Sequence, residues 1–107
     1  MEWYVKAAMQ GAASAQSNLG VCYELGTGVT QDLKLAVEWY AKAAAQGNAE
    51  AQFNLGDIYA RGDVVAQDFK LAAAWFAKAA SQGTADAATR RDACLAQLAP
   101  TAGERRA

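Results

Sequence analysis

A 36-residue period constrains the fold of this chain more than any other feature of its sequence. Tryptophan recurs at Trp3, Trp39 and Trp75. When residues 12–47 are aligned with residues 48–83, 21 of the 36 positions are identical. Periods of this length are typical of solenoids, in which each repeat buries its apolar face only by stacking on its neighbours. We therefore expect a single array of repeats.

The array divides into a half unit, two full units and a further half unit. The predicted units are residues 1–11, 12–47, 48–83 and 84–99, and they are followed by residues 100–107. The first half unit matches only the end of the repeat and the last matches its beginning in degenerate form, as in a capping helix. We expect the final segment to be a flexible tail, because Pro100 ends a helix. The mid-repeat position of Met1 favours a segment of a longer array.

Each full unit is predicted to contain two helices. Ala15, Leu19 and Tyr23 recur at i, i+4 and i+8, the spacing of one helical face. We place the first helix of a unit, helix A, at about 13–25 and 49–61. The second helix, helix B, is placed at about 32–46 and 68–82.

Residues suited to helix ends and close contacts flank these segments. Asp32 and Asp68 are predicted N-caps of helix B, and Gly47 and Gly83 are predicted to end it. Gly20 and Gly56 lie within helix A, where glycine is unfavourable, so we expect them to allow close contact with a neighbouring helix. Val64 replaces Gly28 in the second loop, which we expect to bend differently or to be looser.

Three motifs connect the repeat to a known family. They are Ala-Gln-x-Asn-Leu-Gly-x-x-Tyr at 51–59, Gly-x-Gly-Val-x-x-Asp-x-Lys at 26–34 and Trp-Tyr-x-Lys-Ala-Ala at 39–44. Together they closely resemble the Sel-one-like repeat (SLR) family, which is related to tetratricopeptide repeats. The resemblance implies an all-α, right-handed α/α solenoid. It also implies a non-catalytic adaptor or scaffold, as in bacterial envelope and host-interaction systems and in eukaryotic quality control.

Cysteine and histidine usage bears on an enzymatic alternative. Cysteine-rich SLR relatives, described as penicillin-binding or β-lactamase-like, carry paired cysteines in each repeat. This chain has only Cys22 and Cys94, two repeats apart, and Ile58 at the position between them. We expect both cysteines to be unbridged, since the separation exceeds disulfide reach. Histidine is absent, which removes the commonest general base. A cell-wall or penicillin-binding activity stays an alternative, and we expect no cofactor or metal.

The balance of charge disfavours some partners and not others. Ten basic and eleven acidic residues give a net charge of −1, so nucleic acid is not expected as a partner. No segment is long and apolar enough to span a membrane, and the N-terminus lacks the features of a secretory signal. We expect a soluble protein, cytoplasmic or, if truncated, periplasmic or secreted. The partner is expected to be another protein or a peptide.

By similarity to the tetratricopeptide frame, the concave surface is formed by helix A. Candidate binding residues are those that differ between units or recur at one position on adjacent helices: Ser14, Ser17, Asn18, Val21, Glu24, Glu50, Phe53, Asn54, Asp57, Arg61, Asp86, Thr89 and Arg90. Phe53 is either an exposed anchor for a partner or a packing residue against the next repeat. Asn18, Asn54 and Arg90 are candidates for holding a peptide carboxylate or backbone.

Other surfaces have simpler interpretations. Trp39 and Tyr40, which recur as Trp75 and Phe76, are predicted to pack in the core rather than to form an aromatic cage. The half unit at 1–11 lacks the helix A that covers its apolar residues, so we expect self-association there. A purely structural role within a longer array remains a further alternative.

Overall fold

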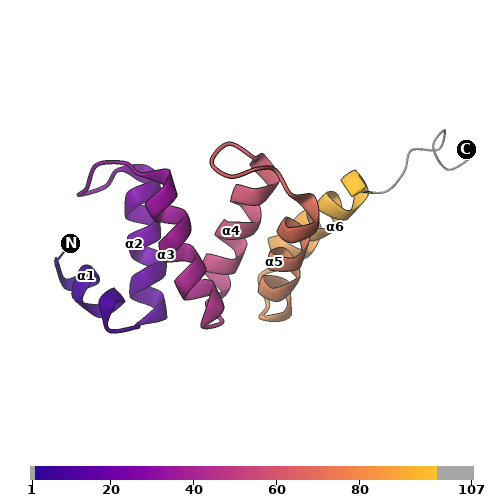
Figure 1. Ribbon diagram of the computed structural model, residues 1–107. Coiled ribbons are helices and arrows are strands. Elements are labelled where there is room, and N and C mark those ends of the chain that lie inside the picture. Colours follow the sequence, from indigo (N-terminus) through magenta and orange to yellow (C-terminus); the bar gives the residue numbers. More distant parts are fainter. Residues whose placement is uncertain (1, 99–107) are drawn as a thin grey trace, which may run out of the picture.

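Six helices and no strand make up residues 2–98, the part of the chain that this computed structural model describes, with side chains described from residue 5 onward. The helices are α1 (Glu2–Met9), α2 (Ala13–Leu25), α3 (Leu33–Ala45), α4 (Ala49–Arg61), α5 (Phe69–Ser81) and α6 (Ala85–Leu98). They follow one another along the molecule as a solenoid, with the α2–α3 and α4–α5 loops at one edge (Figure 1). The predicted all-α solenoid is confirmed.

The helix boundaries agree closely with those expected from the sequence. Helix A corresponds to α2 and α4, whose bounds are those predicted. Helix B corresponds to α3 and α5, each one residue shorter at both ends than predicted. The side chains of Asp32 and Asp68 accept hydrogen bonds from the backbone amides of Leu35 and Leu71, at 3.1 and 3.0 Å. Both predicted N-caps are therefore confirmed. The residues from 99 onward, including Pro100, and the side chains of Trp3 and Tyr4 lie outside the described residues.

Close contact between helices A and B explains the glycines inside helix A. A Cβ atom on Gly20 would lie 2.6 Å from the ring of Tyr40, and one on Gly56 would lie 2.9 Å from the ring of Phe76. The two rings are 0% and 1% exposed. Each aromatic ring therefore lies directly against the helix A backbone, and the predicted close approach is confirmed.

The tryptophans next to these rings have a different environment. Trp39 and Trp75 are half-buried, and the ammonium groups of Lys42 and Lys78 lie 4.7 Å from the centres of their rings. Of each predicted aromatic pair, therefore, one residue is in the core and the other is at its edge beneath a lysine.

Paired glutamines connect successive helices in both full repeats. Gln16 Nε2 donates to the carbonyl of Ala8 at 3.0 Å, and Gln46 Nε2 donates to Gln16 Oε1 at 2.8 Å. Gln52 and Gln82 form the same pair at 3.0 Å one repeat later. In α6 the corresponding residue is Ala88, which has no side-chain amide, so this connection ends before the last helix.

The two A–B loops differ at one backbone position and share their anchors. Gly28 has φ of 75°, whereas no residue other than glycine has a positive φ in the described part of the chain, so Val64 bends differently. The Asp32 amide donates to the Tyr23 carbonyl at 2.9 Å, and the Asp68 amide donates to the Tyr59 carbonyl at 3.0 Å. The predicted difference in bending is confirmed, but both loops are fixed at the same point.

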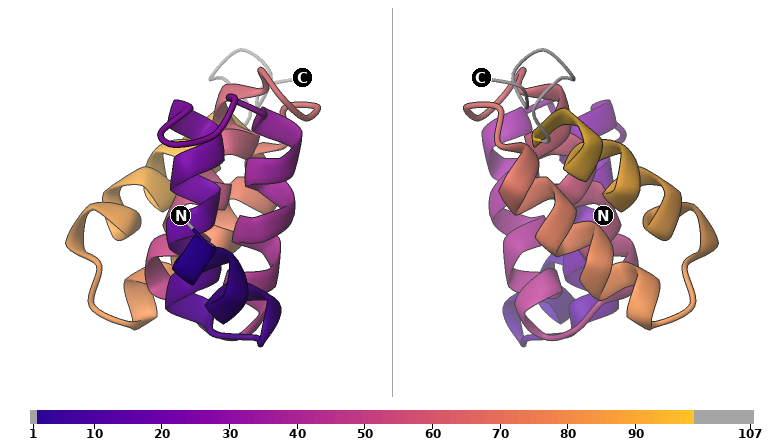
Figure 2. Two further views of the ribbon diagram at one scale, coloured as in Figure 1. Left: turned by 90° about the vertical axis from the view of Figure 1, so that its left-hand side faces the viewer. Right: turned by 90° about the vertical axis from the view of Figure 1, so that its right-hand side faces the viewer.

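The last helix, α6, departs from the repeat. It packs more extensively along α5 than α4 does along α3, and Figure 2 shows it inclined away from the other helices. Arg91 and Asp92 stand where α4 has Leu55 and Gly56. The outer surface of α6 is not uniformly polar, because Leu95 and Leu98 are about half exposed, at 48% and 49%.

Candidate protein-binding face

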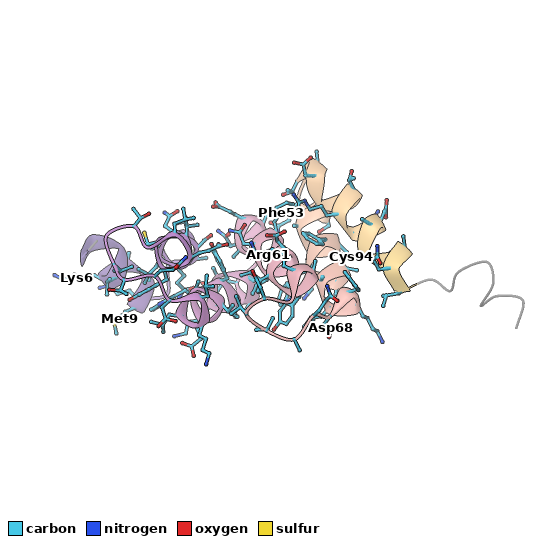
Figure 3. All side chains as sticks on the ribbon, turned by 90° about the horizontal axis from the view of Figure 1, so that it is seen from above. Lys6, Met9, Phe53, Arg61, Asp68 and Cys94 are labelled. Carbon is cyan, nitrogen blue, oxygen red and sulfur yellow. The ribbon has the colours of Figure 1, made fainter. Side chains whose placement is uncertain are left out.

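Helices α2, α4 and α6 form one row of the solenoid, and α3 and α5 form the other (Figure 3). We call the surface of the first row the helix A face. In this view Phe53, Arg61 and Cys94 lie along the first row, whereas Asp68, at the start of α5, lies toward the second. Phe53, Arg61 and Cys94 therefore lie along one side of the molecule.

A chain of ion pairs crosses the helix A face from α2 to α6. Glu24 pairs with Arg61 at 3.5 Å, Arg61 pairs with Asp57 at 3.4 Å, and Asp57 pairs with Arg90 at 3.0 Å. Asp63 lies 3.8 Å from Arg61. Each pair is partly exposed, so it contributes at most about 1 kcal/mol. The connected chain nevertheless orients side chains from three helices.

Tyr40 links this ionic chain to the core. Its hydroxyl donates to Glu24 Oε1 at 2.7 Å, while its ring packs on Gly20. Burial raises the pKa of Tyr40 well above its usual value, and the hydrogen bond to Glu24 and the charge of that carboxylate raise it further. The hydroxyl therefore stays protonated and holds the Glu24 carboxylate in place.

Phe53 is a packing residue rather than an exposed anchor. Its ring is half-buried and meets the ring of Phe76 edge to face, with centroids 5.3 Å apart and planes at 68°. The Arg90 guanidinium lies over the Phe53 ring, 5.2 Å from its centroid. Of the two interpretations of Phe53, the structure thus supports packing against the neighbouring helices.

The remaining candidates on this face differ in accessibility. Ser17 is 1% exposed, and its hydroxyl has no hydrogen-bond partner among the described residues. Its predicted place on a binding surface is therefore wrong, because the helix turns it into the core. The half-buried candidates are Asn18, Val21, Glu24, Asn54 and Asp57, and the exposed ones are Ser14, Glu50, Arg61, Asp86, Thr89 and Arg90. Asn18, Asn54 and Arg90 do not form a free carboxylate site, because Arg90 is already engaged by Asp57 and Phe53.

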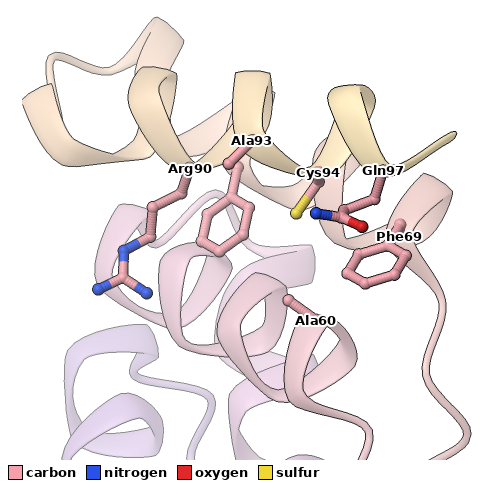
Figure 4. A pocket seen from close by; sticks show the side chains of 7 residues that line it. Ala60, Phe69, Arg90, Ala93, Cys94 and Gln97 are labelled. Atoms are coloured by element: carbon pink, nitrogen blue, oxygen red, sulfur yellow. The ribbon is translucent and has the colours of Figure 1, made fainter. Parts of the chain in front are cut away.

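Two hollows lie between α4 and the helices that follow it. The first, which we call the Glu50 hollow, has a volume of about 390 Å³ and is lined by Glu50, Phe53, Thr84, Ala85 and Asp86. The second, which we call the Cys94 pocket, has a volume of about 210 Å³ and is lined by Ala60, Phe69, Phe76, Arg90, Ala93, Cys94 and Gln97 (Figure 4). Phe53 borders the first hollow and Arg90 the second, and these two residues stack on each other.

Sequence reasoning missed the Cys94 pocket, although the sequence holds a signal for it. Ala60 and Cys94 stand one repeat after Glu24 and Ile58, so both positions carry a smaller side chain in the later unit. Burial raises the pKa of the Cys94 thiol, with a smaller opposing effect of Arg90. The thiol is therefore neutral and adds an apolar surface to the pocket.

Charge is segregated between the two rows of helices. All five lysines of the chain lie on helix B segments, namely α1, α3 and α5. On the helix A face and its adjoining loop, six carboxylates accompany three guanidinium groups: Glu24, Glu50, Asp57, Asp63, Asp86 and Asp92, with Arg61, Arg90 and Arg91. The near-neutral total charge therefore conceals an acidic face.

Metal-ligand clusters and membrane-spanning helices are both lacking among the described residues. No three histidine, cysteine, aspartate or glutamate side chains in that region could together hold a metal ion. None of the helices from α1 to α6 is long and apolar enough to cross a membrane. Cys22 and Cys94 are both free thiols, which confirms that the two do not form a bridge.

Comparison with known proteins identifies the repeat. A family model described as Sel1 repeat matches residues 1–11, 13–48 and 49–84. The chain belongs to the Sel1 repeat family. Proteins of this family generally mediate protein–protein interaction as non-catalytic scaffolds. No curated protein matched the sequence significantly.

Solved structures show the same fold in bacterial Sel1 repeat proteins. A Sel1 repeat protein from Oxalobacter formigenes is 43% identical with a TM-score of 0.77 over 80% of this chain and 35% of its own. A protective antigen present in uropathogenic Escherichia coli strains, which displays an SLR fold, is 45% identical with a TM-score of 0.77 over 79% of this chain and 18% of its own. This Sel1 repeat chain therefore spans about a third or less of the length of these proteins.

Proposed function

We propose that this chain is a non-catalytic interaction module that binds a protein or peptide through the helix A face. The observation that carries the proposal is where the two full repeats differ. The two full repeats differ on both helices, but on helix A the pairs Val21/Asp57, Glu24/Ala60 and Leu25/Arg61 change charge or polarity at positions outside the core. A frame that repeats while one face varies is suited to recognising a particular partner.

The geometry of the face supports this proposal. The ion pairs from Glu24 to Arg90 hold side chains of three helices in fixed positions, which reduces the ordering cost of binding. The Glu50 hollow and the Cys94 pocket provide concave surface beside these charges. The exposed carboxylates of Glu50 and Asp86 provide complementary charge for a partner.

Two alternatives have less support. The cell-wall or penicillin-binding alternative depends on a likeness to relatives with paired cysteines in each repeat, whereas Ile58 interrupts the Cys22 and Cys94 positions here. A structural role within a longer array accords with the 35% and 18% of the solved relatives that the chain covers. That role does not account for the changes of charge and polarity on helix A.

A charge-reversal experiment tests the helix A face. Peptides selected from a displayed library of random twelve-residue sequences provide the probes, and their affinities are measured by fluorescence anisotropy. Asp57→Lys breaks the centre of the ionic chain, and we expect it to weaken binding by about tenfold or more. Circular dichroism melting verifies that the variant remains folded.

The matched control is Glu38→Lys, an equivalent reversal at an exposed position of α3. We expect it to change affinity by less than about twofold, as surface substitutions away from a site usually do. Equal affinities of the folded Asp57→Lys variant and the parent for every selected peptide would rule out the helix A face as the binding surface.

A further inference from the structure

The Cys94 pocket occupies a place that the preceding repeat fills. One repeat earlier, the positions of Ala60, Phe76, Ala93, Cys94 and Gln97 hold Glu24, Tyr40, Asp57, Ile58 and Arg61. There the Tyr40 hydroxyl, the Glu24 carboxylate and the Arg61 guanidinium meet in the space between helices. Between α4 and α6 each of these five substitutions removes atoms or a polar group, whereas the other two lining positions carry larger side chains, Phe69 for Leu33 and Arg90 for Asn54. A pocket of about 210 Å³ remains.

The lining of this pocket determines what it can accept. Phe69, Phe76, Ala60 and Ala93 provide carbon surface, the neutral Cys94 thiol lies among them, and polar groups are confined to Arg90 and Gln97. An apolar cavity of about 150 Å³ in another protein accepts benzene. The Cys94 pocket is therefore large enough for the side chain of a leucine or phenylalanine.

The surface next to the pocket selects for charge. Arg90 is paired with Asp57 at 3.0 Å and covers Phe53, so its charge is largely compensated. At the Glu50 hollow, by contrast, Glu50 and Asp86 are exposed, and neither forms an ion pair within residues 5–98. A partner that lies along this face therefore gains most from a positive charge at the Glu50 hollow.

The distance between the two hollows sets the spacing of the partner's residues. Asp86 and Cys94 are eight residues apart on α6, which corresponds to about 12 Å along a helix axis. An extended chain advances by about 3.3 Å per residue. Two side chains three or four residues apart in an extended segment therefore span the distance from the pocket to the carboxylates.

We propose that the helix A face binds an extended segment of a partner protein in which a leucine- or phenylalanine-sized side chain enters the Cys94 pocket. A lysine or arginine three or four residues away in that segment pairs with Glu50 and Asp86. The proposal rests on the proposed function and specifies the chemistry of its partner. The pocket accepts an apolar anchor from the partner, whereas Phe53 packs within this chain and does not project as an anchor.

Filling the pocket tests this proposal directly. Cys94→Ile places in α6 the residue that α4 has at the same position, Ile58, which is 2% exposed. We expect the variant to melt at or above the parent temperature and to bind the selected twelve-residue peptides about ten- to a hundredfold more weakly, because the apolar side chain loses its place. Ala93→Leu, a substitution at an exposed position of the pocket's edge, is a second variant in case the first does not fold.

Two further variants complete the design. Ala96→Ile adds the same kind of side chain to an exposed position of α6 that does not line the pocket, and we expect no more than a twofold change. Glu50→Lys combined with Asp86→Lys should weaken binding about tenfold and reduce its dependence on salt.

The outcomes distinguish a failure of the pocket proposal from a failure of the proposed function of the helix A face. If Asp57→Lys weakens peptide binding but the folded Cys94→Ile and Ala93→Leu variants do not, the pocket proposal is overturned and the proposed function stays intact. Peptides insensitive to all of these changes would overturn both. Selected sequences without an apolar residue three or four positions from a basic one would also overturn the proposal. In the Cys22→Ser variant without peptide, alkylation of Cys94 that slows as protein concentration rises would mean that a second copy occupies the pocket instead.

Discussion

The junction of α4 with α2 and α3, and that of α6 with α4 and α5, share a backbone plan but are filled differently. In the first, Tyr40, Glu24 and Arg61 form a connected polar cluster between the helices. In the second, Phe76 and Ala60 hold the positions of Tyr40 and Glu24 and line a pocket instead. A few substitutions at equivalent positions have therefore exchanged a filled structural contact for accessible apolar surface.

The difference shows how a repeat protein can acquire a site without changing its fold. The buried alanines Ala36 and Ala72 keep helices A and B in contact in both full repeats. Around that constant frame, residues facing the next helix A can change in size because α6 packs mainly along α5. Stability and recognition are thus assigned to different positions of one repeat.

The largest effect is expected where the two repeats are alike. Ala36 and Ala72 are both 0% exposed, so glutamate at either position would bury a charge without a partner. We expect Ala36→Glu and Ala72→Glu each to lower the free energy of unfolding by about 4 kcal/mol or more, measured by urea denaturation. Lys34→Ala, at an exposed position, should change it by less than about 0.5 kcal/mol. Similar losses in all three variants would show that the alanines are not core residues.

Alanine substitutions at Gly20 and Gly56, against which the two aromatic rings pack, should differ in their cost to stability. Gly20→Ala would force a Cβ against the ring of Tyr40, which is tied to Glu24, and we expect a loss of about 1–3 kcal/mol. Gly56→Ala meets Phe76 at the wider distance of 2.9 Å, and that ring borders the Cys94 pocket, into which it can move. Gly56→Ala should therefore cost at least about 1 kcal/mol less, because the gain in helix propensity is the same at both positions and only the contact with the ring differs. Equal losses in urea denaturation would contradict the difference between the junctions.

Tyr40→Phe makes the first junction resemble the second. Removing the hydroxyl leaves the Glu24 carboxylate without its 2.7 Å donor, and we expect a loss of about 1 kcal/mol at pH 7. Because the pKa of Tyr40 is raised in the folded protein, the unfolded chain loses this proton first, near pH 10. The parent should lose stability above that pH, and Tyr40→Phe should lack this part of the decline. If urea denaturation gave free energies of unfolding that differ between the two proteins by the same amount at every pH from 8 to 10.5, the assignment of this decline to Tyr40 would be refuted.

The smallest effect concerns Ser17, which stands where the second repeat has Phe53. Within the part of the chain that the structure describes, its buried hydroxyl has no hydrogen-bond partner, so Ser17→Ala removes an uncompensated polar group. The exposed Ser14→Ala variant is the matched control, because both changes raise helix propensity equally. We expect Ser17→Ala to gain about 0.5 kcal/mol more than Ser14→Ala in thermal denaturation. A smaller gain than the control would mean that the hydroxyl is satisfied in solution.

The local features of the fold were predictable because they depend on residues near one another in sequence. The boundaries of α2 and α4 follow from apolar spacing, and the start of helix B follows from Asp32 and Asp68, whose carboxylates reach an amide only three residues ahead. The two glycines in helix A also indicated close packing, since glycine inside a helix is unfavourable without such a reason. These interactions are encoded within single repeats.

Only the tertiary structure decided which residues of the helix A face are accessible and what they form. Ser17 and Phe53 share a repeat position, yet one is buried and the other packs at the edge of a hollow, because exposure depends on side chains from adjacent helices. The ionic chain joins Glu24 to Arg61, 37 residues away. The volume of the Cys94 pocket likewise depends on the inclination of α6 relative to α4 and α5. A sequence pattern specifies which positions face a neighbouring helix, but the space left between them is set by how three helices pack together.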